Sequence, residues 1–268
     1  TNSKSVHKKH YMTLPMHRLP LSEEAPEKLR FILEHEGTSS DIGFVILESV
    51  QGEGGYNIPK RSMVKKIRMI CKENNIPYIA DEVQSGIGRT GEWWAFQHFN
   101  IVPDVFSAAK ALQVGATVSS KKMFPEEAGA ISSTWGGGHL IDLATGKAII
   151  ETIKKEKLLD HVKKMGAYLK RAVDDLPSVK NTRGLGLMVA FDLKNQNIRN
   201  NVVVEAVKRG LIVLGCGHSG IRLIPPYIIG KEQIDEAMGV LERAIKKCHE
   251  PGFGHSGKIC DYLECSNS

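Results

Sequence analysis

The chain has 268 residues, of which 41% are hydrophobic and 25% charged, with a formal net charge of +6. This composition is ordinary for a globular protein, and the length allows one large or two modest domains. No apolar run approaches the roughly 18 residues of a membrane helix, and no signal-peptide pattern is present. The five cysteines are an odd number, which favours a reducing cytoplasm over a disulfide framework. The tightest basic group has no interleaved aromatic residues and favours a solvated surface over nucleic-acid binding; it consists of Lys4, Lys8, Lys9 and His10.

Strands and helices alternate in the N-terminal half. Continuous apolar runs occur at residues 43–49, 76–81 and 104–110, and residues 61–75 between the first two have helical spacing. Short buried strands separated by amphipathic helices predict a parallel sheet that is covered on both faces. In such sheets the chemistry gathers where the strands end. Here these ends carry Glu48, Asp81 and Lys110.

The pattern changes in the C-terminal half. A long helix is predicted from about Ile141 to Leu176. Beyond it, strands are expected at residues 184–193, 210–214 and 220–226, with helices at about Asn201–Arg209 and Lys231–Lys247. We therefore expect an α/β fold in three parts: part of a large, mainly parallel-sheet domain over residues 1–160, a small α+β domain over 161–248, and a tail over 249–268.

Two stretches match the pattern GxGxxG, at residues 86–91 and 215–220. A dinucleotide-binding fold needs a strand, then the glycines, then a helix whose N-terminus meets the pyrophosphate. The second match is followed by a predicted strand. The first has no acidic residue about 20 positions further on at the end of a next strand. Both stretches are better interpreted as turns.

Asp81 and Lys110 each have an ordinary interpretation, the first as a helix cap or loop ion pair and the second as a surface lysine. However, they lie on the ends of what read as consecutive strands. A lysine in apolar surroundings loses solvation, so its pKa falls and its free amine can form an imine with a carbonyl. An aspartate under a pyridinium nitrogen and a lysine on an aldehyde carbon are what pyridoxal-phosphate (PLP) chemistry requires.

Residues 80–112, ADEVQSGIGRTGEWWAFQHFNIVPDVFSAAKAL, resemble the core motif of class III aminotransferases, which are PLP enzymes of fold type I. The shared features are the D-E-V-Q tetrad, the G-R-T-G turn, and P-D ahead of the lysine. ESVQGEGG is similar to the family's E-P-I-Q-x-E-G-G, and STWGG to its N/S-T-W segment. RGLGLMVAFDL and IRLIPPYII are similar to strands of its C-terminal domain. Within the family the chain most resembles the branch containing 4-aminobutyrate aminotransferase and L-lysine 6-aminotransferase, and KALQVGA looks like the lysine 6-aminotransferase version.

The resemblance implies a role for each residue around the cofactor. Lys110 would hold PLP as an imine and, once displaced, shuttle a proton at the substrate carbon. Asp81 would keep the pyridine nitrogen protonated, Gln84 would contact the phenolic oxygen, and Val83 would pack against the ring. Thr134 would reach the phosphate of the neighbouring subunit's cofactor, which implies a homodimer with shared active sites.

The resemblance also implies a substrate site. Arg222 would bind a substrate carboxylate through its planar fork, although a surface ion pair is the ordinary interpretation of such a residue. Glu53 would pair with Arg222 while an ω-amine substrate is bound, and would swing away for 2-oxoglutarate. Arg18 would hold the substrate's far carboxylate, and Glu48 would be structural or secondary. The implied activity is transfer of an amino group from 4-aminobutyrate, or from the ε-amine of lysine, to 2-oxoglutarate, giving glutamate and a semialdehyde.

Two alternatives stay open: an amino-acid racemase of the same fold, and a truncated, non-catalytic homologue. The resemblance runs from about Thr1 to Lys247 and begins after the family's N-terminal segment, which carries the turn that grips the PLP phosphate. We therefore expect the 268-residue chain by itself to bind PLP weakly or not at all. No metal is expected, because the spacings of the C-terminal cysteines and histidines fit no regular zinc pattern; these residues are Cys248, His249, His255, Cys260 and Cys265.

Overall fold

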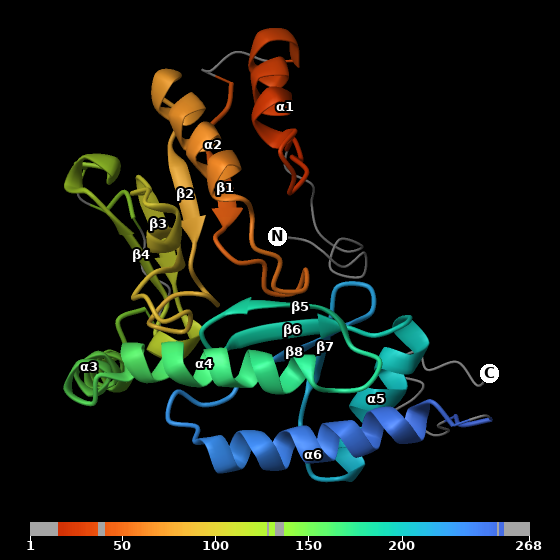
Figure 1. Cartoon of the computed structure of the whole chain (residues 1–268). Coiled ribbons are helices and arrows are strands. Elements are labelled where there is room, and N and C mark those ends of the chain that lie inside the picture. The colour runs from red at the N-terminus through yellow and green to blue at the C-terminus, as the bar shows by residue number, and fades with distance from the viewer. Residues whose placement is uncertain (1–15, 37–40, 128, 132–136, 251, 255–268) are drawn as a thin grey trace. The chain divides into compact units, whose positions relative to one another are not determined.

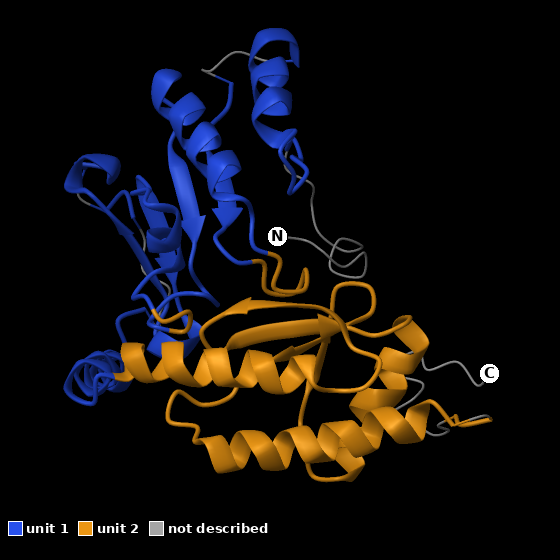
Figure 2. Cartoon of the chain, viewed as in Figure 1, with its two compact units in different colours: residues 1–50, 58–88, 92–157 blue, residues 51–57, 89–91, 158–268 orange. Residues whose placement is uncertain are grey.

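The computed structural model describes residues 16–36, 41–127, 129–131, 137–250 and 252–254. The chain divides into two compact units, drawn in different colours in Figure 2. Unit 1 comprises residues 1–50, 58–88 and 92–157, and unit 2 comprises residues 51–57, 89–91 and 158–268. Two short loops from the N-terminal half of the sequence thus belong to the same unit as the C-terminal stretch. The expected domain boundary at residue 160 and the tail from 249 stay predictions about domain organisation.

Unit 1 contains a four-stranded sheet in the order β1-β2-β3-β4 (Figure 1). The strands are β1 (Val45–Glu48), β2 (Tyr78–Asp81), β3 (Val105–Ala108) and β4 (Ala116–Ser119). The first three run parallel and β4 runs antiparallel to β3. The three apolar runs therefore form the parallel strands that the sequence predicts. β4 was not predicted, because its four residues are half-buried or exposed and carry no apolar run.

In unit 1, two helices each contribute one buried face to the core. In α2 (Arg61–Glu73) the buried positions follow helical spacing, and they pack with Tyr78 and Ala80 of β2 in one hydrophobic cluster. Ala25 and Leu29 of α1 (Ala25–Phe31) join that cluster. The other helical segments are η2 (Ile32–Glu36), η3 (Ala95–Phe99), η4 (Lys110–Leu112), η5 (Lys121–Met123) and α3 (Leu140–Lys155).

Unit 2 contains a second four-stranded sheet, in the order β5-β6-β8-β7, and its neighbouring strands are antiparallel. The strands are β5 (Lys180–Leu185), β6 (Met188–Asp192), β7 (Leu214–Cys216) and β8 (Gly220–Leu223). The helices are α4 (Leu158–Asp174), α5 (Gln196–Lys208) and α6 (Lys231–Cys248). This is the small α+β arrangement that the sequence predicts.

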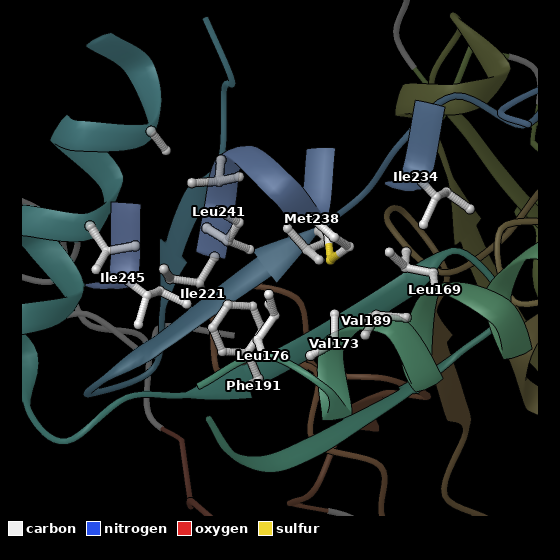
Figure 3. Packing of buried hydrophobic residues seen from close by; sticks show 14 of the residues in the cluster. Leu169, Val173, Leu176, Val189, Phe191, Ile221, Ile234, Met238, Leu241 and Ile245 are labelled. Atoms are coloured by element: carbon white, nitrogen blue, oxygen red, sulfur yellow. The ribbon is translucent and has the colours of Figure 1, made fainter. Parts of the chain in front are cut away.

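The core of unit 2 lies between its helices and its sheet. Figure 3 shows side chains from α4, β6, β8 and α6 meeting in one interior. These include Leu169, Val173, Val189, Phe191, Ile221, Ile234, Leu241 and Ile245. Since Ile221 and Leu223 are buried on one side of β8, the alternation of the strand turns the side chain of Arg222 to the opposite face.

Two glycines allow α4 to approach the β5–β6 turn. A Cβ atom on Gly166 would lie 2.1 Å from the carbonyl oxygen of Gly186, which leaves no room for a side chain. Gly186 itself has a φ of +53°, a left-handed conformation that glycine adopts without steric cost.

The predicted long helix over residues 141–176 is wrong. α3 ends at Lys155 and α4 begins at Leu158, and Lys157 between them has a φ of +52°. The two helices belong to different compact units: α4 packs into the core of unit 2, whereas only Gly146 and Ile153 of α3 are buried. A lysine in the left-handed region gives no sequence signal of a break, because glycine or asparagine is usual there.

The strand predicted at residues 210–214 is also mostly wrong, since only Leu214 lies in β7. β7 pairs with β8 from Leu214 to Cys216, and the turn at residues 217–219 joins the two strands. Residues 83–90 are likewise turns. The interpretation of both GxGxxG stretches as turns is confirmed.

None of the described helices combines the length and the apolar character needed to cross a bilayer. Cys71, Cys216 and Cys248 are buried, and none of these three described cysteines forms a disulfide. The cytoplasmic location expected from the cysteine count stays a prediction.

Candidate active site

Three polar side chains stand in a row across the ends of the parallel strands in unit 1. In the β1–β2 pair Glu48 lies opposite Asp81, and in the β2–β3 pair Asp81 lies opposite Ser107. Lys110 follows three residues after Ser107, at the start of η4. The predicted strand-end residues are therefore held on neighbouring parallel strands, where α/β sheets bind their ligands.

One oxygen of Asp81 is fixed by its own unit. Oδ1 accepts a hydrogen bond from the backbone N–H of Val83 at 3.1 Å and another from the hydroxyl of Ser107 at 3.2 Å. Among the described residues no group donates to the other oxygen, Oδ2. The carboxylate is thus oriented through one oxygen, while the other is left to a ligand.

Glu82 points into the protein and ties three segments together. Its carboxylate accepts hydrogen bonds from the hydroxyls of Ser49 at 2.5 Å and Ser85 at 2.9 Å, and from the backbone N–H groups of Ala95 at 2.8 Å and Phe96 at 2.9 Å. Burial raises the pKa of Glu82, and the four donors offset part of that effect. Because Glu82 directly follows Asp81, this network fixes the backbone that carries the candidate site.

Val83 and Gln84 begin the turn that follows β2. Both residues are half-buried, but the side-chain oxygen of Gln84 is fully buried and has no hydrogen-bond partner in the described part of the chain. A buried amide group without a partner costs free energy. The two ends of an amide are interchangeable by a flip of the group, so the orphan position can face either a donor or an acceptor.

Lys110 has a φ of +48°, which is uncommon for a residue with a side chain. Its carbonyl oxygen accepts hydrogen bonds from the backbone N–H of Gln113 at 2.8 Å and from the side-chain amide of Gln113 at 3.0 Å. The side chain is exposed, so unit 1 does not by itself supply the apolar surroundings that the sequence predicts. Strained backbone of this kind is concentrated at functional sites.

Unit 2 brings together Arg222 and Glu53, two of the residues predicted for the substrate site. Arg222 on β8 donates from Nη2 to Oε1 of Glu53, forming an ion pair between residues far apart in the sequence. The side chain of Arg222 is 11% exposed and that of Glu53 is 33% exposed, so the carboxylate is the outer member of the pair. Nε of Arg222 is buried and has no hydrogen-bond partner in the described residues.

The loop that carries Glu53 is attached to unit 2 at two points, the β7–β8 turn and β5. The backbone N–H of Gly217 donates to the carbonyl oxygen of Glu53 at 2.9 Å, and Nε of Arg183 donates to the carbonyl oxygen of Gly55 at 2.6 Å. Arg183 in turn makes two parallel hydrogen bonds of 3.0 Å to Asp192. The position of Glu53 is therefore set by β5 and by the β7–β8 turn of unit 2.

The remaining predicted residues do not join Asp81 and Lys110 in unit 1, or Arg222 and Glu53 in unit 2. Thr134 lies outside the described residues, as do His255, Cys260 and Cys265. Arg18 is exposed, and its guanidinium contacts the sulfur of Met16 at 3.7 Å. Within the described ranges, no group of three or more His, Cys, Asp or Glu residues could hold a metal ion.

Reasoning from the sequence missed three residues that build these clusters. Ser107 is a single polar residue in an apolar strand, and its position three residues before Lys110 was the signal available. A glutamate is common in a loop, so the sequence gives no sign that Glu82 is buried. Tyr56 is fully buried in the loop that carries Glu53, although it follows two glycines and looks exposed by sequence alone.

The model of the family described as "Aminotransferase class-III" matches residues 3–245 of this chain. The chain belongs to the class-III aminotransferase family. It is 36% identical over 240 residues to the acetylornithine aminotransferase of Methanosarcina mazei, covering 85% of this chain and 60% of that protein. It is 34% identical over 221 residues to that of Caldanaerobacter subterraneus, covering 80% of this chain and 56% of that protein. The chain thus spans little more than half the length of these class-III relatives.

Solved structures of class-III aminotransferases share the fold. The lysine aminotransferase from M. tuberculosis in its internal aldimine form superposes with a TM-score of 0.87 at 28% identity, covering 92% of this chain and 62% of that one. The ornithine aminotransferase from Plasmodium yoelii superposes with a TM-score of 0.73 at 30% identity, covering 83% and 61%. The predicted fold type and the resemblance to class III are therefore confirmed.

Class-III aminotransferases depend on PLP, and the residues of unit 1 fit that cofactor. The partnerless oxygen of Asp81 suits a protonated ring nitrogen, and the orphan amide of Gln84 suits a phenolic oxygen. Two atoms, Oδ2 of Asp81 and Oε1 of Gln84, lack partners within the described chain, as is expected of atoms that are completed by a ligand. The phosphate site predicted at Thr134 falls outside the described residues.

Proposed function

We propose that this protein transfers the terminal amino group of an amino acid to 2-oxoglutarate. The observation that carries the proposal is the placement of Asp81 and Lys110 at the ends of neighbouring parallel strands, in a chain of the class-III family. A carboxylate and a lysine in this arrangement are the two protein groups that PLP chemistry needs.

Each residue of unit 1 has a role in this proposal. Bound PLP supplies an aldehyde carbon for attachment and a pyridine ring that accepts electron density from the substrate carbon. The amine of Lys110 holds the cofactor and, when released, moves the proton at the substrate carbon. Asp81 accepts a hydrogen bond from the ring nitrogen and keeps it protonated. Gln84 donates to the phenolic oxygen, and Val83 packs against the ring.

The Arg222–Glu53 pair supports two substrates with different charge patterns. With Glu53 in contact, the charge of Arg222 is neutralised, which suits the uncharged chain of an ω-amine donor. With Glu53 turned away, the guanidinium fork is open to a carboxylate of 2-oxoglutarate. A racemase has no need of such a second substrate, so the pair favours transamination.

The donor class follows from the names of the relatives. Acetylornithine, ornithine and lysine each carry a primary amine at the end of a side chain. We infer that donors of this kind rank ahead of 4-aminobutyrate, which carries the same terminal amine. Arg18 stays a proposed contact for the donor's far carboxylate. Thr134 stays a proposed contact for a neighbouring subunit's PLP, in a homodimer with shared sites.

Titration of the protein with PLP tests the cofactor site. Because the 268-residue chain alone is expected to bind PLP weakly, the titration uses a full-length protein that also carries the family's N-terminal segment. The visible absorbance band of lysine-bound PLP is expected to appear with this wild-type protein and with Lys121→Ala, an exposed lysine of η5 that serves as the matched control. It is expected to be absent with Lys110→Ala. No band with the full-length wild type would sink the proposal and would favour the non-catalytic homologue.

Glutamate formation tests the reaction. Acetylornithine, ornithine, lysine and 4-aminobutyrate are each mixed with 2-oxoglutarate and the PLP-loaded protein, and glutamate is quantified. We expect glutamate from at least one of the first three donors. A protein that binds PLP and makes glutamate from none of the four, but interconverts the enantiomers of an amino acid, would be a racemase.

A further inference from the structure

Tyr56 is a fully buried tyrosine in the loop that carries Glu53. Its backbone N–H donates to the carbonyl oxygen of Gln51 at 2.9 Å, and the N–H of Gln51 donates to the carbonyl oxygen of Asn57 at 3.1 Å, which closes the loop on itself. The side chain is 0% exposed, and its hydroxyl has no hydrogen-bond partner in the described residues. A buried hydroxyl without a partner costs free energy and calls for an explanation.

A second orphan group belongs to the same cluster of unit 2. Nε of Arg222 is also buried and has no hydrogen-bond partner within the described residues, although Nη2 contacts Glu53. Burial raises the pKa of Tyr56 to about 12, and Arg222 is the strongest of the neighbouring charges that oppose this rise. The phenol is therefore protonated at neutral pH and lies within the electrostatic reach of the guanidinium.

The hydroxyl of Tyr56 and Nε–H of Arg222 can both donate to the same kind of ligand. Nε–H of Arg222 can only donate a hydrogen bond, and a protonated phenol beside a cation donates best to an anion. A carboxylate has two acceptor oxygens, so it can accept from both groups at once. The carboxylate of Glu53 is in place in the structure and leaves both donors without a partner.

The order of exposure indicates how such a ligand would enter. Glu53 is 33% exposed, Arg222 is 11% exposed and Tyr56 is 0% exposed. The acidic side chain is thus the outermost of the three, and its movement into solvent would open a path to the two donors beneath it.

We propose that Tyr56 is a carboxylate-binding residue, whose hydroxyl donates to one oxygen of the acceptor's carboxylate while Nε of Arg222 donates to the other. The inference rests on the proposed function, because it assigns this site to the oxo acid. It makes Tyr56 a specificity-determining residue for the carboxylate of the oxo acid.

Glutarate, a dicarboxylate without an oxo group, probes this site without turnover. Calorimetry with the wild type is expected to detect binding, and Tyr56→Phe is expected to weaken it roughly tenfold, as for loss of one hydrogen bond to a charged group. Ligand-free Tyr56→Phe should be at least as stable to heat as the wild type, because the hydroxyl that it lacks had no partner. A purely structural hydroxyl would give the opposite change in stability.

Tyr168→Phe is the matched control, since it makes the same chemical change in unit 2. The hydroxyl of Tyr168 donates to Asp235 at 2.7 Å on the exposed surface, so this variant should bind glutarate as the wild type does. In turnover, Tyr56→Phe should raise KM for 2-oxoglutarate roughly tenfold and leave KM for the amino donor unchanged.

Three results would overturn the inference: no binding of glutarate by the wild type, equal binding by Tyr56→Phe, or a loss of heat stability in ligand-free Tyr56→Phe. Failure of the proposed function has a different signature. It appears as a missing absorbance band with PLP or as missing glutamate, and neither depends on the hydroxyl of Tyr56.

Discussion

The hydroxyl of Ser107 donates a hydrogen bond to Oδ1 of Asp81 across the β2–β3 pair, with 3.2 Å between the two oxygens. The same oxygen accepts from the backbone N–H of Val83. With both donors on one oxygen, rotation of the carboxylate is restricted and the other oxygen is held ready for the ring nitrogen of PLP.

Ser107→Ala should therefore weaken the binding of PLP roughly fivefold, the size expected for one hydrogen bond of about 1 kcal/mol. The reason is that Asp81 loses one of its two anchors and more of its orientation must be fixed on binding. Absorbance titration measures the affinity. Ser107→Thr keeps the hydroxyl and should bind PLP as the wild type does; equal affinity in Ser107→Ala would contradict the role of this bond.

Glu82 should make stability depend on pH. Because burial raises the pKa of Glu82 above its ordinary value of 4.5, the folded protein holds this proton more tightly than the unfolded chain. Its contribution to stability is therefore full below pH 4.5 and is lost as the pH rises through the folded pKa. Each unit by which the pKa is raised corresponds to about 1.4 kcal/mol.

Urea unfolding of the wild type and Glu82→Gln between pH 4 and pH 8 checks this expectation. The unfolding free energy of the wild type, relative to the variant, should fall as the pH rises. Glu126→Gln, at an exposed position of unit 1, should follow the wild type. Parallel curves for the wild type and Glu82→Gln would show that the folded and unfolded states hold the proton equally.

Arg183→Lys should lower the free energy of unfolding by about 1–3 kcal/mol. A lysine cannot reproduce the two parallel hydrogen bonds to Asp192 together with the third to the carbonyl oxygen of Gly55. Denaturant unfolding measures the change, and Arg171→Lys at an exposed position of α4 is the control. Equal losses in the two variants would mean that the planar fork of Arg183 adds nothing to the free energy of unfolding.

Gly166→Ala should destabilise the protein by about 1–3 kcal/mol, because its Cβ would meet the backbone of Gly186. Gly239→Ala in α6 is the matched control, since its Cβ would meet only the end of the Arg243 side chain, at 3.5 Å. That variant should gain up to about 1 kcal/mol from helix propensity. Thermal unfolding compares them, and a stabilised Gly166→Ala would show that α4 can move away from the turn.

The parallel strands and the residues at their ends could be predicted because both follow local rules. A continuous apolar run indicates a buried strand, and the residue that ends it marks the edge of the sheet. Asp81 and Lys110 were found in this way. β4 was missed because an exposed edge strand has no such pattern, and the break at Lys157 was missed because a lysine in the left-handed region gives no local signal.

The site residues that could not be predicted depend on contacts between residues that lie far apart in the sequence. Whether Ser107 donates a hydrogen bond to Asp81 or makes no such contact depends on the register of β2 and β3. Whether Tyr56 is exposed or buried depends on how its loop is attached to Arg183 and Gly217. Neither the register nor the attachment leaves a mark on the adjoining residues, so periodicity cannot reveal them.

Unit 2 is continuous in space but is assembled from three separate stretches of sequence. Residues 158–268 produced alone would carry Arg222 without Glu53, and Arg183 without the carbonyl oxygen of Gly55. On the ribosome, residues 51–57 and 89–91 emerge long before the strands that receive them, so these contacts must wait until β8 has been synthesised. The contact of Glu53 with Arg222 and that of Gly55 with Arg183 therefore join segments that are made at different times.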